Sequence, residues 1–458
     1  MQMNFGMFPN FNMFNMQNNQ MNNMQNMNLM NNFGNNMFMG NVSNNMGMMG
    51  NNMGGMNQMF NPMNNMNNFM SPIKGIKNFT NNIEASFINS VLQALCCLNC
   101  IKNWYMKLNN VMNNLQPCLT KSFLQLIYCL YSGNQPDSSN IIFQYNLETN
   151  KLLNKNPKTD PFHFLFYFLD LLHYENNYII DKNFNAQLLH NPGLENMKND
   201  TYMSNIFQNY FKSTQNSFVA HNFFNILKIQ ISCPNFNLNC YPLFSYEYRK
   251  IFDFHIDKYR NFRDEAYPNK MGMNLTLEDC FKCYTGGMKI QCHNCGSFNA
   301  NSNTLILFST KVLILAFKRN NHNFKCDIDF DTKINFSMFC KDNIYGTKNV
   351  IYNLTACISL CGMPKYFSDI CINGKWFRFM DDQIKVLNNF YNDIHTYEPQ
   401  ILIYELEENQ NFANNMMNNG FNNGLIMSLN QMQYNQMLMQ IGNLNNMMIN
   451  YKMIKGFN

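Results

Sequence analysis

Charged side chains are scarce in this sequence of 458 residues, and the first 73 positions contain none, because the first charged residue is Lys74. Charged residues make up 13% of the chain, and 33 Lys and Arg against 28 Asp and Glu leave a formal net charge of only +5. The basic residues are scattered and form no polybasic run. We therefore do not expect nucleic acid as a partner.

The sequence also has little that would direct it into a membrane. It contains no run of about 18 apolar residues, because Lys311 interrupts the most apolar stretch, TLILFSTKVLILAF. It does not open with a basic stretch followed by an apolar one, as a secretory signal does. We expect no membrane partner and a cytoplasmic or nuclear protein, in which the 16 cysteines are mainly reduced core thiols.

Composition divides the chain into three zones. Residues 1–70 contain 20 Met and 25 Asn, and residues 409–458 are also rich in Asn and Met. Such limited variety cannot build a specific core, so residues 1–71 and 409–458 are predicted to be disordered flanks of low complexity. Residues 72–408 have the varied composition of a folded domain.

The first half of this middle zone has helical patterns. Ser86 is predicted to open a helix, with apolar residues at helical spacing behind it: Phe87, Val91, Leu92, Leu95 and Leu98. A second helix is predicted after Asp160, which can cap the free amides, with Pro161 at the first helical position. Its buried stripe is predicted to contain Phe162, Leu165, Phe166, Leu169 and Leu172.

The second half has strand patterns. NILKIQIS alternates apolar and polar residues with the period of a half-buried strand. KVLILAFKR, NVIYNLTACISL and PQILIYELE are short apolar runs that are typical of central strands. Helices followed by strands, without regular alternation, predict an α+β fold.

Six blocks of sequence resemble motifs of the ubiquitin-specific proteases, and they occur in that family's order. GIKNFTNNIEASFINSVLQAL is similar to the family's cysteine box, and TDPFHFLFYFLDLLHYE is similar to its Q-D-x-x-E-F-x-x-x-L-L-D-x-L helix. VLILAFKR, YNLTACISLCG, KWFRFMDDQIKV and ILIYELE resemble later strand motifs. The resemblance covers roughly Gly75 to Glu405 and implies a papain-like fold, with a helical thumb and a β-rich palm and fingers.

The resemblance also locates the family's catalytic triad, and these positions are altered. Anchoring on SFINSVLQAL puts Ser86 at the nucleophile position, where the family has cysteine. The G-H-Y-x-A-Y motif corresponds to MPKYFSDICI, so Lys365 stands at the histidine position, and no histidine occurs between His322 and His395. Asp381 is the candidate for the orienting acid, although Met380 is inserted before it.

Several residues near these positions are further candidates for the chemistry. Asn78 and Asn81 cannot be assigned as oxyanion donors, because the Gly75-to-Ser86 spacing is three residues longer than in the family. In a catalytic dyad with Ser86, Lys365 would act as the base only if burial strongly lowered its pKa. The nearby thiols Cys96, Cys97 and Cys100 lie about three turns into the helix, beyond the reach of its dipole, and are predicted to be core residues.

A structural zinc site is a further candidate. The resemblance favours Cys233, Cys240, Cys292 and Cys295 as ligands at the tips of the fingers. Spacing alone also allows a C-x2-C-x8-C-x2-C knuckle formed by Cys280, Cys283, Cys292 and Cys295. The resemblance places LEDCFKCY on a packed helix instead, and His293 is a possible substitute ligand.

The sequence and its resemblance are compatible with three functions. The leading one is a pseudoenzyme that binds ubiquitin, a ubiquitin-like protein or a multiprotein complex, with the tail of ubiquitin in a cleft near Asp160 and Tyr366. The second is an active deubiquitinase whose nucleophile lies elsewhere. The third is self-association through the Met/Asn-rich flanks, with a vestigial protease domain.

Overall fold

The computed structural model describes residues 74–77, 83–109, 112–153, 160–177, 194–235, 240–292, 294–319, 327–339, 350–361 and 365–407. The chain divides into residues 1–70 and 71–458, and every described residue belongs to the second unit. The predicted flanks, 1–71 and 409–458, lie outside the described residues.

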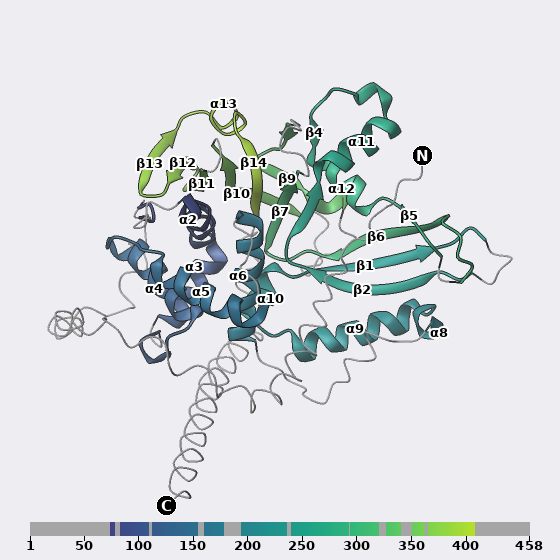
Figure 1. Cartoon of the computed structure of the whole chain (residues 1–458), viewed down its shortest axis with the longest axis horizontal. Helices are drawn as coiled ribbons and strands as arrows, with labels where there is room; N and C mark the ends of the chain where they lie inside the picture. Colours follow the sequence, from purple (N-terminus) through teal and green to yellow (C-terminus); the bar gives the residue numbers. More distant parts are fainter. Residues whose placement is uncertain are drawn as a thin grey trace, which may run out of the picture. The chain divides into compact units, whose positions relative to one another are not determined.

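An eight-stranded sheet forms the centre of the described part (Figure 1). Its strands follow the order β13-β12-β11-β10-β14-β7-β3, with β9 also paired to β10, and only the β3–β7 pair is parallel. The predicted central strands are confirmed as β7, β10 and β14. The strands are β3 (Phe252–His255), β7 (Val312–Lys318), β9 (Lys333–Asn335), β10 (Ile351–Leu360), β11 (Tyr366–Ile372), β12 (Lys375–Met380), β13 (Gln383–Leu387) and β14 (Glu398–Leu406).

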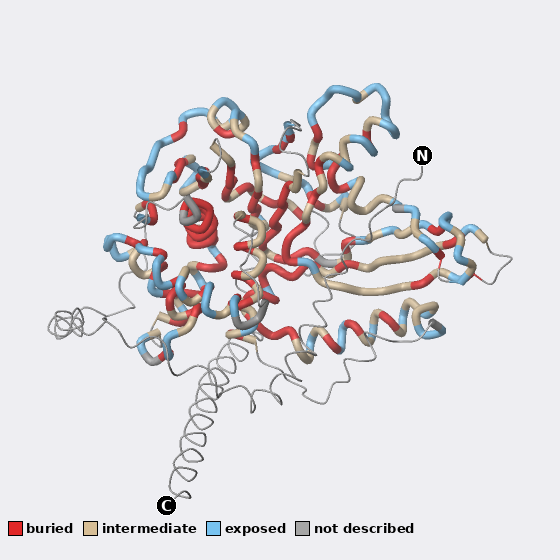
Figure 2. Tube along the Cα trace, viewed as in Figure 1, coloured by how far each residue is buried: buried red, intermediate tan, exposed pale blue. Residues whose placement is uncertain are grey.

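Helices cover one face of this sheet and share a core with it (Figure 2). They include α2 (Ile83–Cys96), α3 (Asn99–Leu108), η3 (Met112–Asn114), α4 (Leu119–Ser132), α5 (Ser139–Leu153), α6 (Pro161–Asn176) and α10 (Phe218–Phe223). Successive side chains of a strand point to opposite faces of the sheet, and this decides which of them join the core. Ile314, Ile358 and Ile401 point toward the helices, whereas Leu315, Cys357 and Leu402 belong to a second core on the opposite face.

Helix α2 is enclosed on several sides, because it packs against β10, β11, β12 and α6. All five predicted apolar residues of this region are buried, which confirms the predicted stripe. The prediction that Ser86 opens the helix is wrong, since α2 begins at Ile83. Ser86 still lies within the first turn, where the helix dipole acts.

Helix α6 begins as predicted. Asp160 is its N-cap and accepts a hydrogen bond from the backbone N–H of His163, and Pro161 follows in the first turn. The predicted stripe is partly wrong, because Phe162 and Phe166 are only half-buried, while Phe164 and Phe168 fill the core. The helix is apolar around most of its circumference, so the sequence allowed either orientation.

A second sheet, of four strands, extends away from the centre as a ribbon (Figure 1). Its order is β2-β1-β6-β5, all antiparallel, and α9 packs along β2. The predicted strand NILKIQIS is β1. The elements are α8 (Leu194–Met197), α9 (Asp200–Thr214), β1 (Asn225–Ser232), β2 (Leu243–Arg249), β5 (Met288–Ile290) and β6 (Ala300–Phe308).

The opposite face of the eight-stranded sheet is covered by a smaller group of elements. They are α11 (Ile256–Ala266), η5 (Pro268–Lys270), α12 (Leu277–Thr285), η6 (Phe336–Met338), α13 (Phe390–Ile394) and the short parallel pair of β4 (Leu275–Thr276) with β8 (Ile328–Asp329). Helix α12 is the packed helix that the resemblance implied for LEDCFKCY. No helix in the described part of the chain is long and apolar enough to cross a membrane.

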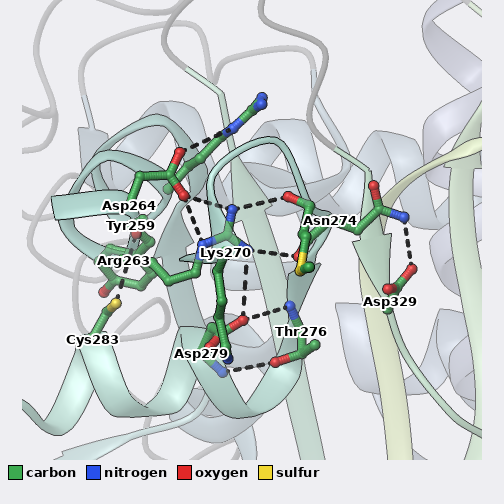
Figure 3. A network of polar contacts seen from close by, with 11 residues as sticks. Tyr259, Arg263, Asp264, Lys270, Asn274, Thr276, Asp279, Cys283 and Asp329 are labelled. Carbon is green, nitrogen blue, oxygen red and sulfur yellow. Dashed lines mark hydrogen bonds and ion pairs between the residues drawn. The ribbon is translucent and has the colours of Figure 1, made fainter. Parts of the chain in front are cut away.

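A buried arginine joins α11 to α12 (Figure 3). Arg263 is 1% exposed and donates hydrogen bonds to the carbonyl oxygens of Met273 and Asn274, at 2.9 and 2.7 Å. Its charge is balanced by Asp264, at 2.8 Å, and by Asp279, at 3.7 Å. These contacts satisfy the guanidinium and hold the loop that precedes β4.

Buried His173 makes the stability of the fold sensitive to acid. Its Nδ1 lies 2.6 Å from Ser217 Oγ, and burial, with repulsion from Lys250, lowers its pKa to about 3. In the unfolded chain this histidine binds a proton below about pH 6.5, whereas in the folded protein it stays neutral. The free energy of unfolding therefore falls as the pH falls.

We predict that acidification from pH 7 to pH 5 removes about 1 to 2 kcal/mol of unfolding free energy through His173. Urea unfolding of the wild type and of His173→Gln at both pH values measures this contribution. The variant should lose less stability on acidification than the wild type, whatever its stability at pH 7. Equal losses would contradict the assignment.

Candidate functional site

The first turn of α2 lies against the start of β11. The backbone N–H of Tyr366 donates a hydrogen bond to Ser86 Oγ at 3.4 Å, and Ser86 is 6% exposed. The carbonyl oxygen of Ser86 in turn accepts a hydrogen bond from Ser90 Oγ at 2.7 Å. The hydroxyl at the predicted nucleophile position is thus an acceptor for a backbone amide.

Two acidic side chains approach Tyr366 from other elements. Burial raises the pKa of Tyr366, and the negative charges of Asp160 and Glu398 raise it further. Asp160 caps α6, while Glu398 opens β14 and forms an ion pair with Arg319 at 2.8 Å. The structure therefore brings the predicted cleft residues Asp160 and Tyr366 within electrostatic range of each other, beside Ser86.

Lys365 directly precedes β11 and is exposed. Its carbonyl oxygen accepts a hydrogen bond from the backbone N–H of Cys361 at 2.8 Å, which closes the loop between β10 and β11. The next histidine along the chain, His395, stacks on Phe330 with ring centroids 4.2 Å apart. Phe330 belongs to the core on the opposite face of the sheet, so His395 is remote from Ser86.

Sequence reasoning missed a different histidine. His163 lies in the first turn of α6, and its Nδ1 is 2.5 Å from Asp160 Oδ2. The side chains of His163 and Asp160 are 26% and 35% exposed. The three-residue spacing of Asp160 and His163 could have predicted this pair, because residues i and i+3 are neighbours on the surface of a helix.

Asp381 lies in the turn that joins β12 to β13. Its φ of +54° is in the left-handed region, and Asn89 Nδ2 on α2 donates a hydrogen bond to Asp381 Oδ1 at 2.8 Å. Asn89 Oδ1 accepts from Ser138 Oγ at 2.7 Å. The candidate for the orienting acid is therefore bound to the buried face of α2, which holds a strained turn in place.

The remaining candidates near α2 are two asparagines and three thiols. Asn78 and Asn81 lie outside the described residues. Cys96 and Cys100 are buried and Cys97 is half-buried, as predicted for core thiols. Burial raises the pKa of all three thiols, that of Cys97 to about 11, so these groups are poor nucleophiles.

A cluster of four cysteines forms a candidate metal centre at the end of the ribbon sheet. The Sγ atoms of Cys233, Cys240, Cys292 and Cys295 all lie within 4.8 Å of one another. Cys233 follows β1, Cys240 precedes β2, and the other two lie between β5 and β6. The ends of two hairpins that are distant in sequence thus supply two thiols each.

The geometry of this cluster suits a tetrahedral metal. The Sγ distances are 3.6 Å for Cys233 to Cys295 and 3.8 Å for Cys240 to Cys292. Four thiolates at about 2.3 Å from a zinc ion would be about 3.8 Å apart. A hydrogen bond from the backbone N–H of Ser297 lowers the pKa of Cys295 to about 6, whereas burial and the neighbouring thiols raise the pKa of Cys240 to about 12, so the first thiolate of the cluster forms at Cys295.

The structure does not bring Cys280 and Cys283 of the alternative ligand set to the cluster. Cys280 is buried in the core of the opposite face of the central sheet, and Cys283 Sγ lies 3.8 Å from the carbonyl oxygen of Tyr259. Both residues are on α12. His293 lies outside the described residues, so its role as a substitute ligand stays a prediction.

The comparisons with known proteins agree with this architecture. The family model for ubiquitin carboxyl-terminal hydrolase matches residues 74–404. A solved SAGA DUB module of Ubp8, Sgf11, Sus1 and Sgf73 bound to monoubiquitin is similar in fold, with a TM-score of 0.52 and 18% identity over 74% of this chain and 70% of that chain. A yeast SAGA DUB module with an Sgf73 mutant gives 0.50 and 17%, over 73% and 69%. No curated protein matches the chain in sequence.

We predict that Gly75→Ala destabilises the site. The added methyl carbon would overlap the carbonyl oxygen of Asp381 and lie 2.7 Å from Asp382 Cα, and both are backbone atoms that cannot rotate away. The expected loss is about 1 to 3 kcal/mol of unfolding free energy, measured by urea unfolding.

Gly287→Ala is the matched control for this substitution. Its methyl carbon would be closest to the side-chain oxygen of Asn303, at 2.7 Å, which can move aside. We expect it to lose less stability than Gly75→Ala. Equal losses in the two variants would mean that contact with the Asp381 turn is not what requires glycine.

Proposed function

Because the chain belongs to the ubiquitin carboxyl-terminal hydrolase family, we propose that it is a non-catalytic member that binds ubiquitin or a ubiquitin-like protein as a scaffold. The observation that carries the proposal is the environment of Ser86. Its hydroxyl accepts a backbone hydrogen bond from Tyr366, and the residue at the base position, Lys365, is exposed. A serine nucleophile depends on a neighbouring general base even more than a cysteine does.

The third triad position supports the same proposal. In an active enzyme a carboxylate orients the imidazole of the base. One oxygen of Asp381 instead accepts a hydrogen bond from Asn89, a buried residue of α2. This contact gives Asp381 a structural reason to be present in the absence of catalysis.

The proposed binding mode follows from the family architecture. The helices around α2 form the thumb, the eight-stranded sheet forms the palm, and the ribbon sheet forms the fingers. The globular part of ubiquitin would rest on palm and fingers, and its C-terminal tail would approach Ser86 between Asp160 and Tyr366. The similar SAGA DUB module was solved with monoubiquitin, and we propose by analogy that this chain also works within a multiprotein complex.

A working deubiquitinase is the second candidate, and one observation favours it. The His163–Asp160 pair places an imidazole beside a carboxylate, and Asp160 lies within electrostatic range of Tyr366. A hydrolase that uses this pair would need Ser86, or another nucleophile, to react with the end of the ubiquitin tail. The experiment below separates the two candidates.

We predict that the full chain binds plain ubiquitin and forms no adduct with a ubiquitin probe that carries a C-terminal electrophile. Calorimetry measures the binding, and intact-protein mass spectrometry measures the adduct. An adduct of the wild type would identify a working nucleophile and overturn the pseudoenzyme. Absence of binding would overturn the scaffold.

Ser86→Cys is the positive control for the probe experiment. A thiol at this position lies in the first turn of α2, where the helix dipole favours the thiolate. We expect this variant to form the adduct, at a rate that rises with pH. Ser90→Cys, one turn further along the buried helix, should stay unmodified.

We also propose that the cysteine cluster binds one structural zinc ion, with Cys233, Cys240, Cys292 and Cys295 as its ligands. The ion would join the two hairpins of the fingers and stabilise a region with a small apolar core. We also propose a cytoplasmic or nuclear location for the protein.

Zinc content gives a direct test of this centre. The purified chain should carry one zinc ion by elemental mass spectrometry, and Cys240→Ala should lose most of it. Cys371→Ala is the matched control, because Cys371 is a half-buried thiol of β11 outside the cluster. Equal zinc in both variants would exclude the cluster as the site.

A further inference from the structure

Two aromatic side chains of α6 lie at the edge of the thumb core and pack against it. Phe162 and Phe166 are one turn apart and half-buried, although their neighbours Phe164 and Phe168 are fully buried. Each of these two rings also contacts a lysine from the palm side. The contacts therefore connect α6 of the thumb to the palm.

The first contact is between α6 and the end of β7. Lys318 Nζ lies 4.0 Å from the centroid of the Phe162 ring and 2.7 Å from Asp253 Oδ2 on the neighbouring strand β3. The side chains of Lys318 and Asp253 are 31% and 29% exposed. A partly exposed cation over an aromatic face is a weak contact that can break and reform.

The second contact lies one turn further along α6. Lys250, in the turn between β2 and β3, has its Nζ 3.7 Å from the centroid of Phe166 and forms an ion pair with Asp170 of α6. Its side chain is only 3% exposed. Breaking this contact would leave a buried charge without compensation, so it is far costlier to open than the first.

The weaker contact lies at the proposed entrance for the ubiquitin tail. Phe162 is two residues after Asp160, and Arg319, which follows Lys318, is paired with Glu398. Asp160 and Glu398 are the two acids that act on Tyr366. The Phe162–Lys318 contact therefore joins the same two walls that flank Tyr366 and Ser86.

We propose that the Phe162–Lys318 contact is a gate that closes the cleft of the free protein, and that the Phe166–Lys250–Asp170 contact is the fixed hinge beside it. A ubiquitin tail must displace Lys318 from Phe162 to reach Ser86. This inference rests on the proposed function and adds a regulation of the same site. The binding energy of ubiquitin is reduced by the cost of opening the gate.

Ubiquitin affinity tests the gate. Calorimetric titration of the full chain should show that Lys318→Gln and Phe162→Leu bind ubiquitin about 3- to 10-fold more tightly than the wild type. The double variant should gain little beyond either single one, because both remove the same contact. Unchanged or weaker binding of Lys318→Gln would overturn the gate.

Lys333→Gln is the matched control for the change of charge. Lys333 lies on strand β9, is 62% exposed and forms an ion pair with Glu407. This variant should therefore bind ubiquitin as the wild type does. A gain equal to that of Lys318→Gln would assign the effect to net charge and overturn the gate.

A measurement without ubiquitin separates the gate from the proposed function. Hydrogen exchange of the first turn of α6 should be faster in Lys318→Gln than in the wild type or in Lys333→Gln. If no variant binds ubiquitin, the proposed function fails, while faster exchange still supports a closed cleft held by Lys318. Unchanged exchange would overturn the gate whether or not ubiquitin binds.

Discussion

The burial of α2 is the constraint on which the rest of this structure depends. The helix packs against three strands and another helix, so its polar side chains are enclosed together with its apolar ones. Enclosed polar groups are costly unless they are hydrogen-bonded. Asn89 meets this requirement through Asp381 and Ser138, and Gln93 donates to the carbonyl oxygen of Lys74. Helix α2 thereby holds the start of the domain and the β12–β13 turn.

This requirement explains why the contacts around α2 are kept whatever the chemistry of the site. Asn89 and Asp381 contribute to folding through their mutual contact, and Gly75 provides the space for the turn that contains Asp381. Lys365 has no comparable packing demand, since it is exposed, whereas buried Ser86 accepts a hydrogen bond from the backbone N–H of Tyr366.

Carboxylates from distant strands and helices also hold the thumb together. Glu405 of β14 accepts hydrogen bonds from the backbone N–H groups of Asn99 and Cys100 at the start of α3. Glu175 of α6 does the same for Leu119 and Thr120 at the start of α4. A negative charge at a helix N-terminus satisfies free amides and interacts favourably with the dipole. The palm and the thumb thus share electrostatic contacts as well as a core.

The sequence by itself determined the type and order of the main elements. Residue pattern was sufficient for β1, β7, β10 and β14, and for the start of α6 at Asp160, because periodicity and capping are local properties. Motif order identified the family, and it predicted altered triad positions at Ser86, Lys365 and Asp381. The elements needed only residues close together along the chain, and the family needed only the linear order of its motifs.

Only the tertiary structure decided how distant residues meet. It selected which face of α6 enters the core, and so placed Phe162 and Phe166 under Lys318 and Lys250. It also assembled four thiols from two hairpins and excluded those of α12. The sequence could not decide these points, because α6 is apolar on several sides and the cysteine spacing fits two ligand sets. The choice belongs to the packing of the whole domain, in which each contact depends on the others.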